Sequence, residues 1–71
     1  MLVSYDRLWK LLIDKKMTRT ELKEASGISF NVLAKLGRNE FVSMESIYKI
    51  CLALGCDIGD VVRLEKEEGQ K

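Results

Sequence analysis

Apolar residues recur every three or four positions along most of the chain, which is the spacing of one face of an α-helix. No stretch alternates apolar and polar residues over enough positions to indicate a strand. The chain also contains no proline that would interrupt a helix. The pattern therefore predicts an all-α fold of five helices joined by short turns.

The first two predicted helices begin at residues that favour helix starts. A helix is expected from about Tyr5 to Lys15, with Ser4 as its N-cap. Thr18 and Glu21 are spaced for a capping box, in which each side chain accepts from the backbone N–H of the other residue. A second, short helix is therefore expected over residues 19–26. Gly27, which adopts the left-handed conformation easily, ends it.

Three further helices follow. Ser29 is expected to cap a helix that runs from 30 to 37 or 38 and ends through Gly37 or Asn39. Ser43 caps a fourth helix over residues 44–54, which Gly55 ends. A fifth, short helix begins after Asp57, and its apolar residues are Ile58, Val61, Val62 and Leu64. We expect one domain over residues 1–64 and a polar tail over residues 65–71.

The link between the second and third helices narrows the choice of fold. It consists of Ser26, Gly27, Ile28 and Ser29, which is too tight for two antiparallel helices lying side by side. A turn of this length with a glycine suits two helices that cross at a steep angle. We expect the crossing to be fixed by a small core of Leu22, Ile28, Leu33 and Leu36.

The third helix then points its polar residues outward. At about 100° per residue, the residues that face away from Leu33 and Leu36 are Phe30, Asn31, Ala34, Lys35 and Arg38. There is no acidic residue between Glu24 and Glu40. Amide, ammonium and guanidinium groups bind base edges and phosphates, and apolar carbon packs on the thymine methyl. Phe30 has two possible roles, contact with a thymine methyl or packing back on the second helix.

The charge distribution agrees with a polyanionic partner. The net charge is only +1, but residues 1–40 hold eight basic and five acidic side chains, whereas residues 41–71 hold four and six. The basic excess lies around the predicted corner of the second and third helices. Lys16, Arg19 and Thr20 lie where the second helix would cross a DNA backbone. Ser29 and the two helix N-termini offer N–H groups to phosphates.

The chain resembles the Cro/CI-type helix-turn-helix regulators, in particular their short single-domain bacterial members. The resemblance covers residues 4 to about 64 and rests on "KMTRTELKEASGIS", "SFNVLAKLGRNE" and "VSMESIYKICLALGCDIGDVV". It implies a five-helix, lambda-repressor-like fold. Two positions depart from the family pattern: Lys23 stands where the family usually has alanine, and Gly37 where many relatives have glutamate.

The resemblance also implies roles for individual residues. Arg19 would contact the DNA backbone, the outward residues of the third helix would face bases or flanking phosphates, and the loop after that helix would approach the backbone. The predicted DNA contacts are Lys16, Arg19, Thr20, Ser29, Phe30, Asn31, Ala34, Lys35, Arg38 and Asn39. The implied function is a sequence-specific transcriptional regulator, by default a repressor, acting as a homodimer on double-stranded DNA.

Two questions stay open at this point. The same fold also serves as a protein-interaction module, such as an antitoxin or an anti-repressor. One exposed patch formed by Trp9, Phe30, Tyr48 and the C-terminal valines and leucine would favour that function. Trp9 and Tyr48 either complete the core or lie at a dimer interface, where aromatic residues are enriched.

The remaining composition excludes several other functions. The chain of 71 residues has no histidine and only two cysteines, Cys51 and Cys56, whose spacing fits neither a redox pair nor a common zinc site. We interpret both as buried thiols in a reducing cytosol. No paired carboxylates or activated nucleophile indicate an enzyme. We expect a cytoplasmic protein that has no membrane segment, no cofactor and no small-molecule ligand.

Overall fold

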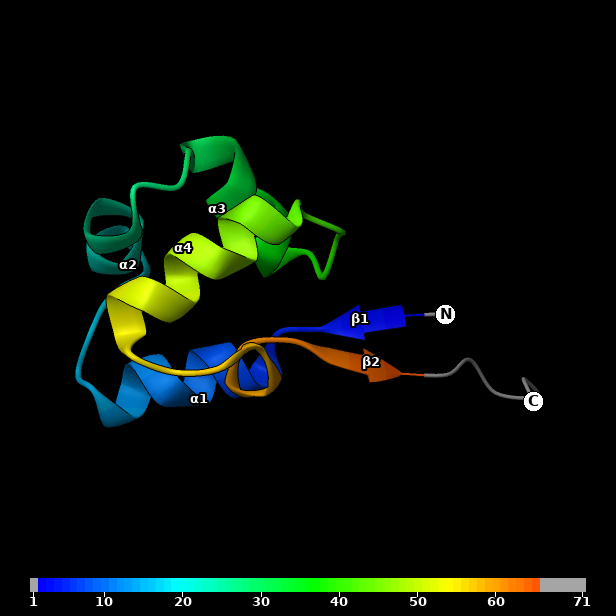
Figure 1. Ribbon diagram of the computed structural model, residues 1–71, viewed down its shortest axis with the longest axis horizontal. Coiled ribbons are helices and arrows are strands. Elements are labelled where there is room, and N and C mark those ends of the chain that lie inside the picture. The colour runs from blue at the N-terminus through cyan, green and yellow to red at the C-terminus, as the bar shows by residue number, and fades with distance from the viewer. Residues whose placement is uncertain (1, 66–71) are drawn as a thin grey trace.

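Four α-helices and one small sheet make up the fold (Figure 1). The structure is a computed structural model, which describes residues 2–65. The helices are α1 (Asp6–Asp14), α2 (Arg19–Ser26), α3 (Phe30–Gly37) and α4 (Met44–Leu54). They are followed by a single 3₁₀ turn, η1 (Ile58–Asp60). The strands are β1 (Leu2–Ser4) and β2 (Arg63–Glu65). The mostly helical fold predicted from the pattern is therefore confirmed.

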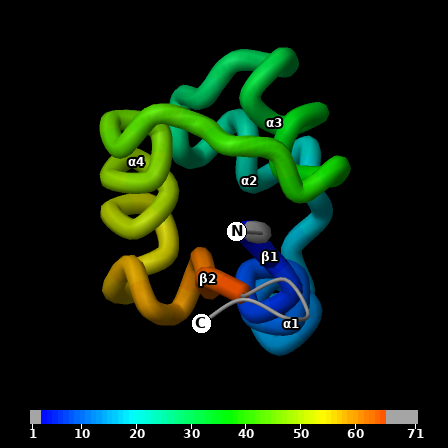
Figure 2. The backbone as a smooth tube through the Cα atoms, turned by 90° about the vertical axis from the view of Figure 1, so that its right-hand side faces the viewer, coloured from blue at the N-terminus to red at the C-terminus, as the bar shows by residue number. Residues whose placement is uncertain are grey.

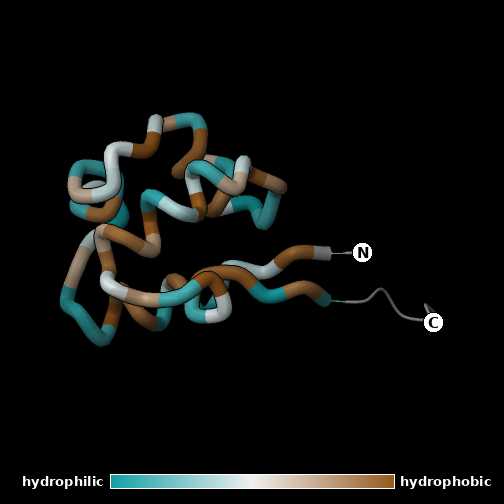
Figure 3. The backbone as a smooth tube through the Cα atoms, in the orientation of Figure 1, coloured by the Kyte–Doolittle hydropathy of each residue, from teal (hydrophilic) through white to brown (hydrophobic). Residues whose placement is uncertain are grey.

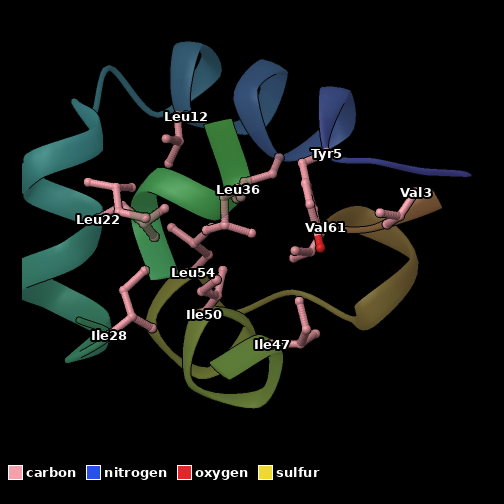
Figure 4. Packing of buried hydrophobic residues seen from close by; sticks show 12 residues of the cluster. Val3, Tyr5, Leu12, Leu22, Ile28, Leu36, Ile47, Ile50, Leu54 and Val61 are labelled. Carbon is pink, nitrogen blue, oxygen red and sulfur yellow. The ribbon is translucent and has the colours of Figure 1, made fainter. Parts of the chain in front are cut away.

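A single apolar core joins all four helices. Apolar and polar residues interleave along the helices (Figure 3), and each of the four helices contributes buried side chains to the core. The four residues predicted to fix the α2–α3 corner all belong to this core, and Leu22 and Leu36 are fully buried within it (Figure 4). The buried apolar residues are Val3, Tyr5, Leu8, Leu12, Leu22, Ile28, Leu33, Leu36, Ile47, Ile50, Leu54 and Val61.

The predicted ends of the fold are wrong in two respects. The fifth helix is only the turn η1, and Leu64 lies in β2, which pairs antiparallel with β1 in the register Leu2–Glu65, Val3–Leu64 and Ser4–Arg63. Strands of three residues are too short to show an alternating pattern, so the sequence offered no strand signal here. Glu65 of the predicted polar tail belongs to β2, while the rest of that tail lies outside the described residues.

The start of α1 also differs from the prediction. Ser4 is not its N-cap, because it lies in β1 and Tyr5 takes the cap position without a side-chain hydrogen bond. The hydroxyl of Ser4 instead accepts from the N–H of Asp6 at 3.3 Å. The other predicted caps are confirmed: Thr18 and Glu21 form the capping box, and Ser29, Ser43 and Asp57 accept from backbone N–H groups in the first turns that follow.

Each of the four helices is followed within two residues by one in the left-handed conformation. Gly27 (φ 79°) and Gly55 (φ 66°) end α2 and α4, as the sequence predicts. The chain leaves α3 through Asn39 (φ 56°) and not through Gly37, and it leaves α1 through Lys16 (φ 55°). At Lys16 the backbone forms a Schellman motif, in which the N–H of Met17 donates to the carbonyl of Leu12 at 2.9 Å.

The conformation of Lys16 leads to a stability prediction. A left-handed conformation costs an L-residue about 1–2 kcal/mol of strain, which glycine avoids. Glycine also loses more backbone conformational entropy on folding, and this loss cancels part of the gain. We expect Lys16→Gly to raise the free energy of unfolding by about 0.5–1 kcal/mol in urea denaturation. Lys15→Gly is the matched control, because Lys15 is right-handed (φ −88°) and its replacement should lower stability.

Tyr5 connects α1 to the loop after α3. Its side chain is 1% exposed, and its hydroxyl donates to the carbonyl of Glu40 at 2.7 Å. Its backbone N–H donates to Oδ1 of Asn39 at 3.3 Å. Burial raises the pKa of the Tyr5 phenol above its ordinary value of 10.0, so the fold favours the protonated form.

Tyr5→Phe should therefore destabilise the domain in a way that depends on pH. The lost hydrogen bond is expected to cost about 0.5–1.5 kcal/mol below pH 10. Since the folded-state pKa is raised, the wild-type advantage is fully present below the unfolded pKa and is lost as pH rises through the folded one. Urea unfolding of both proteins from about pH 8 to about pH 11 measures this. A constant difference across that range would contradict the assignment.

Candidate nucleic-acid interface

The corner between α2 and α3 is built as the sequence predicts. Gly27 turns the chain out of α2, with its N–H donating to the carbonyl of Lys23 at 2.9 Å. Ile28, which is 5% exposed, then turns into the core, and Ser29 starts α3 by accepting from the N–H of Val32 at 3.2 Å. The two helices are thus held at a fixed corner in the upper part of the domain (Figure 1).

The outer side of α3 is exposed and carries no acid. Asn31 and Lys35 are exposed, Ala34 is half-buried between them, and Phe30 is 70% exposed. Phe30 therefore does not pack back on α2, which settles the question that the sequence left open about its packing. The side of α3 opposite Leu33 and Leu36 thus presents an aromatic ring, an amide and an ammonium group to solvent.

The predicted contacts before α2 and in its first turn are also exposed, and Arg19 reaches the end of α3 near Gly37. Lys16, Arg19 and Thr20 are all exposed, at the end of α1 and in the first turn of α2. The hydroxyl of Ser29 is already used as the cap of α3. Its interaction with a phosphate would therefore be through the N–H groups of the first turn, which a helix N-terminus leaves free.

The guanidinium of Arg19 has a structural partner that the sequence analysis missed. Its central carbon lies 3.9 Å from the centre of the Trp9 ring, a cation–π contact between α2 and α1. A Cβ on Gly37 would lie 3.2 Å from Nη1 of Arg19, so the missing side chain there lets the guanidinium approach the end of α3. Arg19 is therefore held between α1 and α3 rather than extended freely into solvent.

The loop after α3 contains an ion pair. Nε of Arg38 lies 2.7 Å from Oε2 of Glu40, and the side chains are 60% and 46% exposed. The hydrogen bond from Arg38 lowers the pKa of the Glu40 carboxyl, and the same bond raises that of the guanidinium. An exposed pair of this kind contributes little to stability and is easily exchanged. A phosphate is therefore able to replace Glu40 as the partner of Arg38.

Asn39 has a second role that the sequence did not reveal. Its Oδ1 accepts from the N–H of Tyr5, which ties the loop to the start of α1. Its left-handed backbone is also the exit from α3. Asn39 therefore positions the loop that holds Arg38, and its amide oxygen faces inward. The positive φ tolerated by asparagine was the signal available in the sequence.

Residues 7–67 match the family described as the Cro/C1-type HTH DNA-binding domain. The chain belongs to this family. A solved structure of the transcriptional regulator VanUg has the same fold: it is 50% identical, the TM-score is 0.89, and the match covers 93% of this chain and 88% of that one. No curated protein matches the chain.

Two residues depart from the pattern of the Cro/C1-type family, and the structure shows where each one lies. Lys23, where the family usually has alanine, is half-buried on α2. Gly37, where many relatives have glutamate, leaves room for the Arg19 guanidinium, which stacks on Trp9. The Trp9 ring on α1 thus stacks against the Arg19 guanidinium at the start of α2.

Within residues 2–65, no three His, Cys, Asp or Glu side chains gather so as to hold a metal ion. None of the described helices is long and apolar enough to cross a membrane. Cys51 and Cys56 are free and half-buried, and burial raises the pKa of both thiols. The two thiols are thus less buried than the sequence analysis predicts, and a thiol with a raised pKa is a poor nucleophile.

Proposed function

We propose that this regulator binds DNA sequence-specifically with α3 in the major groove, and that it represses transcription as a homodimer. The observation that carries the proposal is the exposed, acid-free side of α3, where Asn31 and Lys35 stand beside the apolar Phe30 and Ala34. Asn and Lys read adenine and guanine edges, respectively, in the major groove. The similarity to VanUg, described as a transcriptional regulator, supports the regulatory role.

The surrounding residues are assigned to the DNA backbone. Arg19 and Thr20 lie at the start of α2, and Lys16 lies before it, where that helix would cross the phosphates of one strand. Arg38 would contact the backbone from the loop after α3 once it exchanges Glu40 for a phosphate. These contacts fix the position of α3 but do not read sequence.

A homodimer is proposed because one small module makes few contacts. A single domain of this size buries roughly 600–1,000 Å² on DNA, less than most specific complexes. Two copies on half-sites one helical turn apart, about 34–36 Å, would double the contacts. Repression by covering a promoter is the simplest action for two such copies, since the described residues form only the DNA-binding domain.

The protein-interaction function is less well supported. That function predicts a single exposed patch formed by Trp9, Phe30, Tyr48 and the C-terminal apolar residues. Two members of this set are not exposed: Trp9 packs half-buried against the core, and Val61 is fully buried. Phe30 lies on α3 and Tyr48 on α4, each more than 60% exposed.

Arg19→Ala tests the backbone contacts. If Arg19 neutralises one phosphate, its loss should weaken binding to all duplexes alike and reduce the slope of log K against log salt by about 0.9. Arg19→Lys is the matched control, because it keeps the charge and should keep the slope. Fluorescence anisotropy at several salt concentrations measures both. An unchanged slope for Arg19→Ala would remove Arg19 from the interface.

A further inference from the structure

The exposed side of α4 carries an apolar stripe without a partner among the described residues. Met44, Tyr48 and Leu52 are spaced four residues apart and therefore lie in one line along the helix. Their side chains are 67%, 63% and 64% exposed. Ile58, 39% exposed, extends the stripe beyond the end of the helix. A surface helix normally has polar residues on the side opposite its buried face.

The stripe also borders a groove of about 420 Å³. The groove runs along α4 to η1, and its walls include Ile47, Cys51 and Cys56 together with the four residues of the stripe. Contiguous apolar surface of this kind on a small soluble domain marks an interaction site. The stripe shares no residue with the outer side of α3, and α3 and α4 occupy different sides of the domain (Figure 2).

The charges beside the stripe indicate what covers it. Glu45 and Lys49 follow Met44 and Tyr48 by one residue each, so both lie on the same edge of the stripe. Within one chain they form an exposed pair at 3.7 Å. When two copies of α4 pair antiparallel about a twofold axis, this edge of one helix lies beside the same edge of the other helix, and the two edges run in opposite directions. Each Glu45 then faces a Lys49 of the other copy, whereas in a twofold parallel pair the two copies of this edge lie on opposite sides of the contact and do not meet.

We propose that two copies of this chain pair through the stripe of Met44, Tyr48, Leu52 and Ile58, with their α4 helices antiparallel. This inference rests on the homodimer of the proposed function and names its surface. A standard interface covers about 800 Å² of each partner, and four side chains of this exposure supply on the order of 400 Å². The dimer is therefore weak without DNA, with a dissociation constant on the order of 100 μM.

Sedimentation equilibrium of the full chain without DNA tests the pairing. From about 10 μM to about 1 mM, the wild type should pass from monomer to dimer. Leu52→Asp should weaken association at least about tenfold, because it places a charge in the apolar contact. Ile13→Asp is the matched control: Ile13 is 73% exposed on α1, and its variant should associate within about twofold of the wild type. Circular dichroism checks that both variants are folded.

A mixing experiment tests the antiparallel direction. Glu45→Lys makes the edge entirely basic, and Lys49→Glu makes it entirely acidic, so each variant alone should associate less than the wild type. An equimolar mixture should recover wild-type association, because a basic edge then meets an acidic one.

Three results would overturn the proposal: a wild type that stays monomeric at about 1 mM, equal association of the Leu52 and Ile13 variants, or a mixture no better than its components. Because DNA is absent, such results leave the α3 contacts standing. Conversely, if α3 proves not to contact DNA, the self-association measured without DNA is unaffected.

Discussion

Leu36→Ala should remove most of the stability of the domain. Leu36 is fully buried, and it lies at the centre of the core among side chains that include Leu22, Ile50 and Leu54 (Figure 4). Truncating a buried leucine costs about 2–5 kcal/mol, because transfer energy is lost and a cavity remains. A domain of this size has roughly 5 kcal/mol or little more in total. We expect the melting temperature to fall by at least about 10 °C.

The control for this variant is Leu52→Ala. Leu52 has the same side chain but is 64% exposed on α4, so its replacement should change the free energy of unfolding by no more than about 0.5 kcal/mol. Thermal unfolding followed by circular dichroism, at a concentration where the chain is monomeric, compares the two. Equal effects of both replacements would mean that Leu36 does not hold the corner of α2 and α3.

Asn31→Ala and Lys35→Ala should each reduce affinity for the cognate duplex by about 5- to 150-fold. This range corresponds to about 1–3 kcal/mol for the loss of one base contact. Each variant should also relax specificity at one base pair, because the hydrogen bonds that reject other bases are removed. Both side chains are exposed, so the fold should be unaffected.

Lys10→Ala is the control for the two α3 variants. Lys10 is exposed on α1, away from the corner, and its loss removes one positive charge as Lys35→Ala does. It should change affinity only slightly and leave the preferred sequence unchanged. Electrophoretic mobility shift at fixed salt, with the cognate duplex and single-base variants, measures all three. A uniform loss across every duplex would assign Lys35 to a phosphate and not to a base.

The sequence predicted the parts of the fold that local chemistry determines. The Thr18–Glu21 capping box and the stop at Gly27 depend on residues within a few positions of each other, and both are confirmed. The pairing of β1 with β2 joins residues about sixty positions apart through strands of three residues each. No local pattern marks such a pairing, and the apolar residues after Asp57 were therefore assigned to a helix.

The candidate site could be predicted in outline but not in its internal contacts. The outward side of α3 follows from helical spacing once Leu33 and Leu36 are placed inside. The contacts of Arg19 with Trp9, and of Asn39 with Tyr5, depend on how α1 packs against the corner. That packing is a property of the whole core. The absence of a side chain at Gly37 was the one local signal of a close approach there.

Selection of bound duplexes from a random pool, at fixed salt, tests the central claim most directly. We expect the wild-type protein to enrich a single motif with twofold symmetry, its half-sites separated by one helical turn. The same selection with Lys35→Ala should lose preference at the same position in both half-sites. Failure of the folded wild-type protein to enrich any sequence would contradict the account that α3 reads DNA.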